Sequence, residues 1–411
     1  MAVATPSVTE ICLAAQAASR SLATMSSAAK DAALLRVADA LEARADEVLE
    51  ANGRDLQAGR EAGLSSALMD RLALDPARIA AIAAAVRAIA ALPDPVGEVI
   101  DGHRLPNGLD VRKVRVPLGV IAVIYEARPN VTVDAAALCL KSGNAIVLRG
   151  SSSAAHSNAV LASIVSAEFP DGAVSLVSGG REQLAELAGQ EGVVDLIIPR
   201  GGEGLKKALS EVARVPVIYA ASGNCHVYVD ASADLDAALR IVVNAKTQRP
   251  GVCNAAETLL VHADVAAAFL PAVEAALGGV ELRADARAGS FLHGATPATD
   301  EDFAEEFLAL ILAVKVVDSH EEAIDHVNRY GSGHSEAIVT GSAQAARAFQ
   351  LGVDAACVYV NASTRFTDGG EFGMGAEIGN STQKLHARGP IGLRELCTFK
   401  YLVEGDGQTR A

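Results

Sequence analysis

Nine short apolar runs, separated by segments long enough for a helix, constrain the fold of this chain more than any other feature. The run Val120-Ile-Ala-Val-Ile124 is typical, because it contains no polar residue and β-branched side chains dominate it. Such strands are buried on both faces, as in parallel sheets that helices cover on each side. The chain is therefore predicted to be an α/β protein. The predicted strands are residues 119–125, 144–149, 174–177 and 194–198 in a first series, and residues 226–230, 257–262, 308–317, 336–340 and 357–361 in a second.

The segments that flank these two series have a different character. Residues 8–92 are rich in alanine and carry apolar residues at helical spacing, which predicts a helical entry segment. Asn107-Gly108 is typical of a hairpin turn, and residues 109–116 alternate apolar and polar side chains as a half-exposed strand does. Residues 367–379 are predicted to form a long loop, and residues 396–403 a final strand.

Composition excludes several classes of protein. A chain of 411 residues, half of them apolar, is predicted to form roughly two or three domains. The net charge of −15 argues against a nucleic-acid partner. The six cysteines form no CxxC pair, so neither a metal site nor a disulfide framework is predicted, and a reducing compartment fits best. Without a signal peptide or an apolar run that could span a bilayer, we expect a cytoplasmic protein with no membrane partner.

Cys253 is the most informative single residue. A helix is predicted for residues 235–247, Pro250-Gly251 breaks it, and a strand follows from residue 257. A thiol on such a helix-to-strand turn points out of the packing, and the neighbouring Arg249 supplies charge that stabilises a thiolate. A small buried hydrophobe is the alternative, favoured by about two to one on the local residues alone.

Two glycine clusters resemble phosphate-binding turns. Gly201 and Gly202 open a predicted helix directly after a strand, so the helix N-terminus there can receive an anion. An ordinary strand-to-helix turn explains the same residues equally well. Gly373-x-Gly375 is rejected as a dinucleotide fingerprint, because no predicted strand leads into it.

Several separate segments carry a resemblance to a known family, and they are Tyr125–Thr132, Leu138–Arg149, Gln248–Asn254 and Tyr330–Ile338. Together they resemble the aldehyde dehydrogenase superfamily, and within it the branch that reduces the acyl phosphate of glutamate, over nearly the whole chain. The resemblance implies a Rossmann-like cofactor domain, a catalytic domain and a small β oligomerisation flap. The implied bounds are residues 1–103 and 121–225 with about 342–366 for the NADP-binding domain, 226–341 for the catalytic domain, and 104–120 and 367–411 for the flap.

The same resemblance implies roles for single residues. Cys253 corresponds to the catalytic nucleophile, and Glu306 to the glutamate that binds the nicotinamide ribose. Arg149 stands where a basic residue holds the adenosine ribose, and its planar guanidinium suits a 2′-phosphate, so NADPH is the expected coenzyme. Asn130 is the expected oxyanion donor, with Arg128 as the alternative. The glycine turn at residues 201–202 is assigned to cofactor binding.

Substrate recognition is assigned to residues near these segments. The substrate that the resemblance implies, L-glutamate 5-phosphate, carries phosphate, carboxylate and ammonium groups. Arg128 and Arg249 are therefore candidate anion contacts, and Glu126 is a candidate for the ammonium. Each of these could instead serve a structural ion pair. His334 lies in a segment typical of the family and is a further substrate candidate, although a local hydrogen-bonding role is its alternative.

Ala220 bears on the reaction mechanism that the resemblance implies. Hydrolytic members of the superfamily have a water-activating glutamate at the corresponding position, and without it a thioester on Cys253 should resist hydrolysis. The implied reaction is reduction of L-glutamate 5-phosphate to L-glutamate 5-semialdehyde and phosphate in proline biosynthesis. A coenzyme A-acylating dehydrogenase and a catalytically silent scaffold are the alternatives. The implied partners are further copies of the chain and, through channelling, glutamate 5-kinase.

Overall fold

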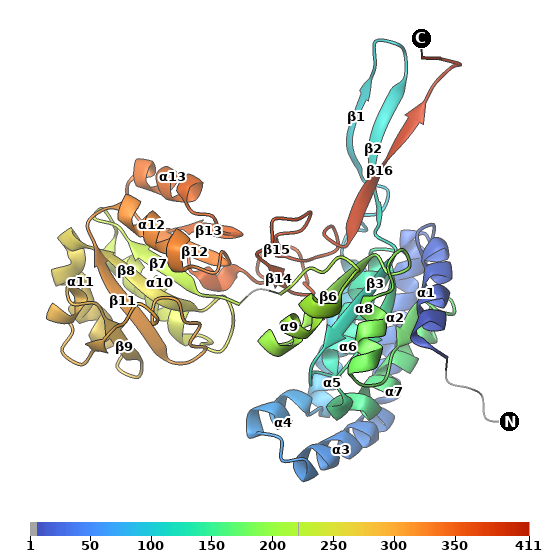
Figure 1. The fold of residues 1–411 in the computed structure, drawn as a ribbon, viewed down its shortest axis with the longest axis horizontal. Helices are drawn as coiled ribbons and strands as arrows, with labels where there is room; N and C mark the ends of the chain where they lie inside the picture. The colour runs from blue at the N-terminus through green and yellow to red at the C-terminus, as the bar shows by residue number, and fades with distance from the viewer. Residues whose placement is uncertain (1–5, 221, 411) are drawn as a thin grey trace. The chain divides into compact units, whose positions relative to one another are not determined.

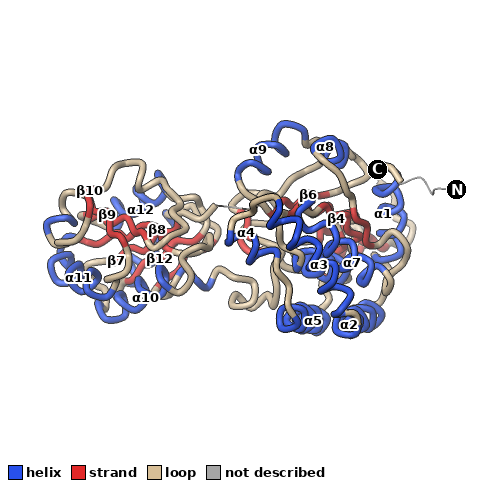
Figure 2. Tube along the Cα trace, turned by 90° about the horizontal axis from the view of Figure 1, so that it is seen from below, coloured by secondary structure: helices blue, strands red, loops and turns tan. Residues whose placement is uncertain are grey.

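The structure is a computed structural model that describes residues 6–220 and 222–410, and the chain divides into two compact units (Figure 1). The first unit comprises Met1–Ala220, Met374–Gly379 and Ile391–Ala411, and the second comprises Ala221–Gly373 and Asn380–Pro390. Each unit contains its own parallel sheet, whose strands are flanked by helices (Figure 2). The predicted α/β class is confirmed.

The first unit begins with helices, as predicted for residues 8–92. Their starts follow from capping chemistry: Ser7 and Glu10 form a capping box at the first helix, and the Asp75 side chain accepts from Arg78 N in front of Pro76. The five helices are α1 (Val8–Leu22), α2 (Ser27–Ala43), α3 (Ala45–Glu61), α4 (Ser66–Leu72) and α5 (Pro76–Ala91).

The parallel sheet of the first unit has the strand order β5-β4-β3-β6. Its strands are β3 (Val120–Tyr125), β4 (Ala145–Arg149), β5 (Val174–Leu176) and β6 (Leu196–Arg200), and its helices are α6 (Asn130–Lys141), α7 (Ala155–Ser166) after the 3-10 turn η1 (Ser152–Ala154), α8 (Arg181–Ala188) and α9 (Glu203–Val212). Every residue of β3 is buried, as its apolar sequence predicts. Because the strands are parallel, Tyr125, Arg149 and Arg200 end at the same edge of the sheet.

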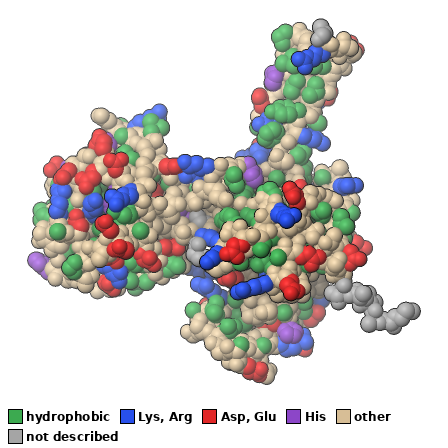
Figure 3. Space-filling model, in the orientation of Figure 1, with side chains coloured by type: hydrophobic (Ala, Val, Ile, Leu, Met, Phe, Trp, Pro, Cys, Tyr) green, Lys and Arg blue, Asp and Glu red, His purple; other side chains and the backbone are tan. Residues whose placement is uncertain are grey.

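A three-stranded antiparallel sheet projects from the first unit (Figure 1). The strands β1 (Val99–Arg104) and β2 (Asp110–Pro117) form the hairpin that Asn107-Gly108 predicts, and β16 (Cys397–Glu404) pairs with β2 along its whole length. The strand β1 was not predicted, because all six of its side chains are exposed and the sequence therefore has no alternation of buried and exposed residues there. Apolar side chains on this sheet face solvent (Figure 3), and they are Val99, Ile100, Phe399, Tyr401, Leu402 and Val403.

The second unit holds a seven-stranded sheet with the order β10-β9-β11-β8-β7-β12-β13. Its strands are β7 (Cys225–Val229), β8 (Ala256–His262), β9 (Glu281–Ala284), β10 (Thr296–Pro297), β11 (Ile311–Val317), β12 (Ser335–Val339) and β13 (Cys357–Val360). The helices are α10 (Leu235–Thr247), α11 (Ala263–Ala276), α12 (His320–Tyr330) and α13 (Ala343–Gly352), with the 3-10 turns η2 (Ala288–Ser290) and η3 (Thr364–Phe366); a small hairpin pairs β14 (Asn380–Ser381) with β15 (Gly389–Pro390).

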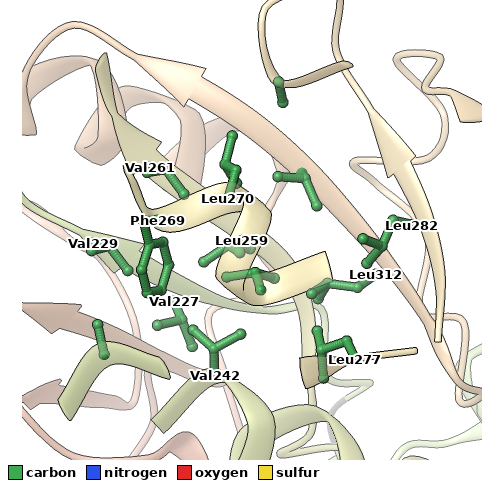
Figure 4. Close-up of a cluster of buried hydrophobic side chains, with 14 of the residues drawn as sticks. Val227, Val229, Val242, Leu259, Val261, Phe269, Leu270, Leu277, Leu282 and Leu312 are labelled. Carbon is green, nitrogen blue, oxygen red and sulfur yellow. The ribbon is translucent and has the colours of Figure 1, made fainter. Parts of the chain in front are cut away.

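Helices cover both faces of this second sheet. Phe269 of α11 and Val242 of α10 pack with Leu259 in one apolar core (Figure 4). On the other face, Tyr228 packs with Phe349 of α13, with the two ring centroids 6.2 Å apart. Burial on both faces explains why the apolar runs of the second series could be recognised as strands.

The predicted domain bounds need correction at two places. Residues 367–373 and 380–390 of the predicted flap belong to the second unit. Residues of about 342–366 were predicted to join the first domain, but the structure places them in the second unit. The physical reason is strand pairing: β13 lies parallel to β12, with Ser335 opposite Cys357, so this segment completes the edge of the second sheet. The predicted loop over residues 367–379 contains no helix or strand.

Three chemical properties of the described residues bear on function. None of their helices is long and apolar enough to cross a membrane. They contain no group of three or more His, Cys, Asp and Glu side chains that could hold a metal ion. None of the six cysteines forms a disulfide, and five are buried whereas Cys253 is only half-buried. Cys253 is thus the thiol most accessible to a small molecule.

Candidate active site around Cys253

Cys253 lies where the sequence predicts it, on a turn between a helix and a buried strand. The helix α10 ends at Thr247, and β8 begins at Ala256. Within the turn, Ala255 N donates to Val252 O at 3.1 Å, which curls the backbone around the cysteine. The strand side of the turn is buried and the helix side is exposed, so Cys253 stands at the boundary between core and solvent.

The backbone of Gly223 lies directly against the backbone of Cys253. A Cβ atom added to Gly223 would lie 2.7 Å from Cys253 Cα, and nearer still to its carbonyl carbon and oxygen. The buried thiol of Cys225 donates to Cys253 O over 3.2 Å. These two contacts fix the position of the Cys253 main chain, and no residue larger than glycine fits at position 223.

Glu306 reaches the same place from a different part of the sequence. Its Oε1 accepts from Gly223 N at 2.5 Å, so Gly223 joins Glu306 to the Cys253 backbone. Close by, the buried Glu257 carboxylate accepts from Lys246 Nζ at 2.5 Å and from Leu308 N at 3.1 Å. Burial, with a smaller contribution from Glu306, raises the pKa of Glu257 to about 7. Two residues that the sequence analysis assigned to the active site, Cys253 and Glu306, therefore lie together.

Arg365 is a candidate residue that the sequence analysis missed. Its Nε donates to Gln248 Oε1 at 2.8 Å, and its charge interacts with Cys253 and with Arg249. Burial lowers the pKa of the Arg365 guanidinium, whereas Arg249 is exposed. No sequence pattern marks Arg365, because it follows β13 and reaches Cys253 only through the fold.

The loop that carries Arg365 is fastened to the residue after the nucleophile. Asn254 Nδ2 donates to Thr367 O at 2.9 Å, and Thr364 Oγ1 donates to Asn254 O at 2.7 Å. Because both bonds are buried, they hold the loop and the turn as one body. The positive charge of Arg365 is thereby kept near the thiol.

His334 is buried rather than open to a substrate. Its relative exposure is 1%, and Nδ1 lies 2.7 Å from Ser335 Oγ and 4.0 Å from Cys225 Sγ. Burial lowers the pKa of His334 to about 4, so the ring is neutral at pH 7. These contacts favour the local hydrogen-bonding alternative over direct binding of a substrate anion.

In the first unit, the carboxylate of Glu126 occupies the glycine turn at residues 201–202. Gly202 N donates to Glu126 Oε2 at 3.3 Å, and a Cβ on Gly201 would lie 2.8 Å from Glu126 Cδ. A carboxylate thus sits at the N-terminus of α9, where an anion is electrostatically favoured. In this conformation Glu126 uses the Gly202 N–H that a bound phosphate would need. The ammonium-binding role predicted for Glu126 and the phosphate-binding role predicted for the turn therefore exclude each other here.

The other candidates of the first unit lie near the carboxyl ends of its strands. Arg149 ends β4, and its Nη2 donates to Gly180 O at 2.7 Å and to Gly179 O at 3.2 Å. Arg128 is exposed shortly before α6, and Asn130, at the start of that helix, donates from Nδ2 to Asp134 Oδ2 at 2.9 Å. Burial raises the pKa of Asp134 to about 6. One amide hydrogen of Asn130 is thus already engaged by Asp134.

A buried histidine on α12, His326, gives a prediction about the dependence of stability on pH. The ring of His326 packs against His226, Phe303 and Tyr330, with its centroid 4.6 Å from that of Tyr330. Neither ring nitrogen has a hydrogen-bond partner among the described residues. Burial lowers the pKa of His326 to about 3, and repulsion from His226, Lys315 and Arg329 acts in the same direction.

We expect His326→Phe to flatten the dependence of stability on pH. The folded state keeps His326 neutral, whereas the unfolded chain takes up a proton below pH 6.5, so wild-type stability falls as the pH falls. Between pH 6.5 and pH 5 the wild type should lose about 1.6 kcal/mol more than His326→Phe. Urea unfolding at several pH values measures this difference, with the exposed His293→Gln as control. Parallel curves for the wild type and His326→Phe would contradict it.

Known proteins are similar to this chain over both of its units. The sequence model of the aldehyde dehydrogenase family matches residues 2–296 and 276–400. Two proteins named gamma-glutamyl phosphate reductase, from Thermobifida fusca and Moorella thermoacetica, are 58% and 57% identical over 404 residues, 96% of this chain and 97% of each of those proteins. The crystal structure of a gamma-glutamyl phosphate reductase from Thermotoga maritima has a TM-score of 0.96 and 45% identity, covering 99% of this chain and 100% of that one.

Proposed function

This chain belongs to the aldehyde dehydrogenase family and, within it, to the gamma-glutamyl phosphate reductases, and from that membership we propose its reaction. The chain reduces L-glutamate 5-phosphate to L-glutamate 5-semialdehyde and phosphate with NADPH, in proline biosynthesis. One observation carries the proposal: a half-buried Cys253 stands on a turn held by Gly223 and Arg365, in a chain 58% identical to a protein of that name.

The first step belongs to Cys253. Its thiolate attacks the acyl carbon of the substrate, and phosphate leaves with the electron pair of the broken carbon–oxygen bond, giving a thioester. Because phosphate is a good leaving group, this step needs no strong general acid. The negative charge that develops on the carbonyl oxygen requires hydrogen-bond donors, for which we propose the Cys253 backbone N–H with Asn130 or Arg128.

The chain offers two residues suited to hold the coenzyme. Arg149 Nε is buried and has no hydrogen-bond partner among the described residues, so it fits an anionic acceptor such as the 2′-phosphate. Glu306, joined to the Cys253 backbone through Gly223, is proposed to bind the nicotinamide ribose. Bound NADPH supplies the hydride that reduces the thioester carbonyl. Cys253 is then the leaving group as the semialdehyde departs.

Arg365 is proposed to stabilise the Cys253 thiolate. A half-buried cation near a thiol favours the thiolate, so Arg365→Met should lower kcat/KM by about 100-fold at pH 7 and shift the pH–rate profile to higher pH. Steady-state assays across pH measure the shift. The exposed Arg240→Met on α10 is the matched control. An equal loss at every pH would contradict this role and leave only a positional effect.

The proposed reaction is tested most directly in the oxidative direction. Purified protein is mixed with L-glutamate 5-semialdehyde and phosphate, and reduction of NADP is compared with reduction of NAD. We expect turnover that requires phosphate and prefers NADP. Replacing phosphate by coenzyme A separates this function from the acylating alternative, since turnover with coenzyme A but not with phosphate would overturn the proposal.

The projecting sheet supports a proposal about assembly. In the order β1-β2-β16, the strand β16 is an edge strand with unpaired backbone groups, and Tyr401 and Val403 on it are exposed. Such an edge is a template for pairing with a second chain. We therefore propose a homodimer or higher homo-oligomer that forms through this sheet.

A further inference from the structure

The residues that line a polar cavity in the second unit were given no role in the reaction above. It lies between the end of α12, the start of β12 and the β14–β15 hairpin, and its volume is about 460 Å³. The residues that matter here are Gly331, Glu336, Asp354, Thr382, Lys384 and Arg388. All belong to one compact unit, so the cavity is defined by that unit alone.

Glu336 presents an unmet acceptor to this cavity. The side chain is fully buried, and its Oε2 accepts from His226 N at 2.7 Å and lies 3.0 Å from His226 Nδ1. Its Oε1 has no hydrogen-bond partner among the described residues. A Cβ on Gly331, which lines the cavity, would lie 3.1 Å from this oxygen, so Oε1 lies directly behind the cavity wall at Gly331. A buried carboxylate oxygen without a partner is costly.

Arg388 presents an unmet donor to the same cavity. Its Nη2 donates to Asp354 Oδ1 at 3.0 Å, and Lys384 also pairs with Asp354. Arg388 Nε is buried and lacks a partner within the described part of the chain. Burial raises the pKa of Glu336, and a cation next to Oε1 would favour the ionised carboxylate again. With Glu336 ionised, the cavity walls carry two carboxylates and two cations, so their net charge is zero. A simple anion or a simple cation would leave either the donor or the acceptor unmet.

We propose that this cavity binds an α-amino acid as its zwitterion. The ammonium donates to Glu336 Oε1, and the carboxylate accepts from Arg388 Nε, so both buried groups gain a charged partner and the balance of charge is kept. Lys384, on the hairpin, adds a second donor near the carboxylate. The amino acid is either a separate molecule or the amino-acid end of the substrate, and in the second case the inference rests on the proposed function.

The class of ligand is tested with three matched probes on the full chain. Ligand-observed saturation-transfer NMR compares L-alanine, propionate and ethylamine, which are the zwitterion, its anionic half and its cationic half. We expect the Kd of L-alanine to be at least about tenfold lower than that of either half. Propionate binding as tightly as L-alanine would overturn the proposal, because it would identify a plain anion site. Absence of L-alanine binding would overturn it as well.

Two variants locate the binding. Glu336→Gln and Arg388→Met should each raise the Kd of L-alanine at least about tenfold, whereas Arg347→Met, an exposed arginine on α13, should not. Glu336 supports His226, so its variant can fail to fold. Arg388 has a half-exposed side chain, and thermal melts should show that Arg388→Met keeps the fold. Unchanged binding by Arg388→Met would overturn the assignment.

Two further measurements identify the source of the amino acid. If the cavity holds the substrate's own end, saturating L-glutamate 5-semialdehyde displaces L-alanine, and Arg388→Met raises KM while kcat is kept. If a separate molecule binds, L-alanine stays bound beside the semialdehyde. Either result supports the cavity assignment. A protein that binds L-alanine but shows no phosphate-dependent turnover would leave the cavity assignment standing and remove the proposed reaction, so the two failures are distinguishable.

Discussion

Cys253→Ala is expected to abolish reduction of L-glutamate 5-phosphate, with kcat/KM falling by at least about 10⁴-fold. The reason is chemical: without the thiol no thioester forms, and the single difficult displacement is no longer divided into two easier ones. Because Cys253 is only half-buried on a turn, its truncation should leave the free energy of unfolding nearly unchanged. Steady-state kinetics and urea unfolding of the same preparation measure both quantities.

Two other cysteines serve as controls for this prediction. Cys12→Ala removes a buried thiol from α1 of the first unit and should lower stability without lowering kcat/KM. Cys225→Ala is the sharper control, because it removes the thiol that donates to Cys253 O while leaving the nucleophile in place. It should cost activity far less than Cys253→Ala. A Cys253→Ala protein with a tenth of wild-type activity would be incompatible with covalent catalysis at this residue.

The parallel sheets could be predicted from sequence because burial on both faces leaves a pattern in the strands themselves. The runs at Val120–Tyr125 and Cys225–Val229 are apolar throughout or nearly so, and the structure buries every one of their residues. The exposed β1 carries no such pattern, and the short β9 and β10 offer too few residues to form one. The sheet that β13 joins depends on its pairing with β12, which no local pattern encodes.

The candidate site likewise contains residues that the sequence predicts and others that only the fold brings together. Cys253 could be recognised because its chemistry and its turn are both local. The buried place of His334 instead depends on a chain of hydrogen bonds from His334 to Ser335 and from Ser335 to Thr367. The contact between Glu126 and the Gly202 backbone joins two strand ends of one sheet, and each residue alone suggests a different ligand. Spatial neighbours drawn from distant segments are therefore what sequence reasoning misses.

Gly223 is the clearest case, because its importance lies wholly in a tertiary contact. As one glycine in an irregular segment before β7, it gives no signal in the sequence. In the structure its N–H binds Glu306 and its Cα approaches the Cys253 main chain more closely than any side chain allows. It therefore sets the separation between the proposed nicotinamide-ribose contact and the nucleophile, and a change at this position should disturb both.

Gly223→Ala is accordingly expected to lower kcat/KM by at least about 100-fold, because the added methyl group must displace the Cys253 backbone, and displacements near 1 Å cost about this much. Overpacking of the same contact should lower the free energy of unfolding by about 1–3 kcal/mol. Gly251→Ala is a matched control in the same turn, since its Cβ would meet only Leu308 O, at 3.7 Å. Steady-state kinetics and urea unfolding of both variants measure kcat/KM and the free energy of unfolding. Equal kcat/KM values for the two variants would mean that the Gly223 contact does not position Cys253.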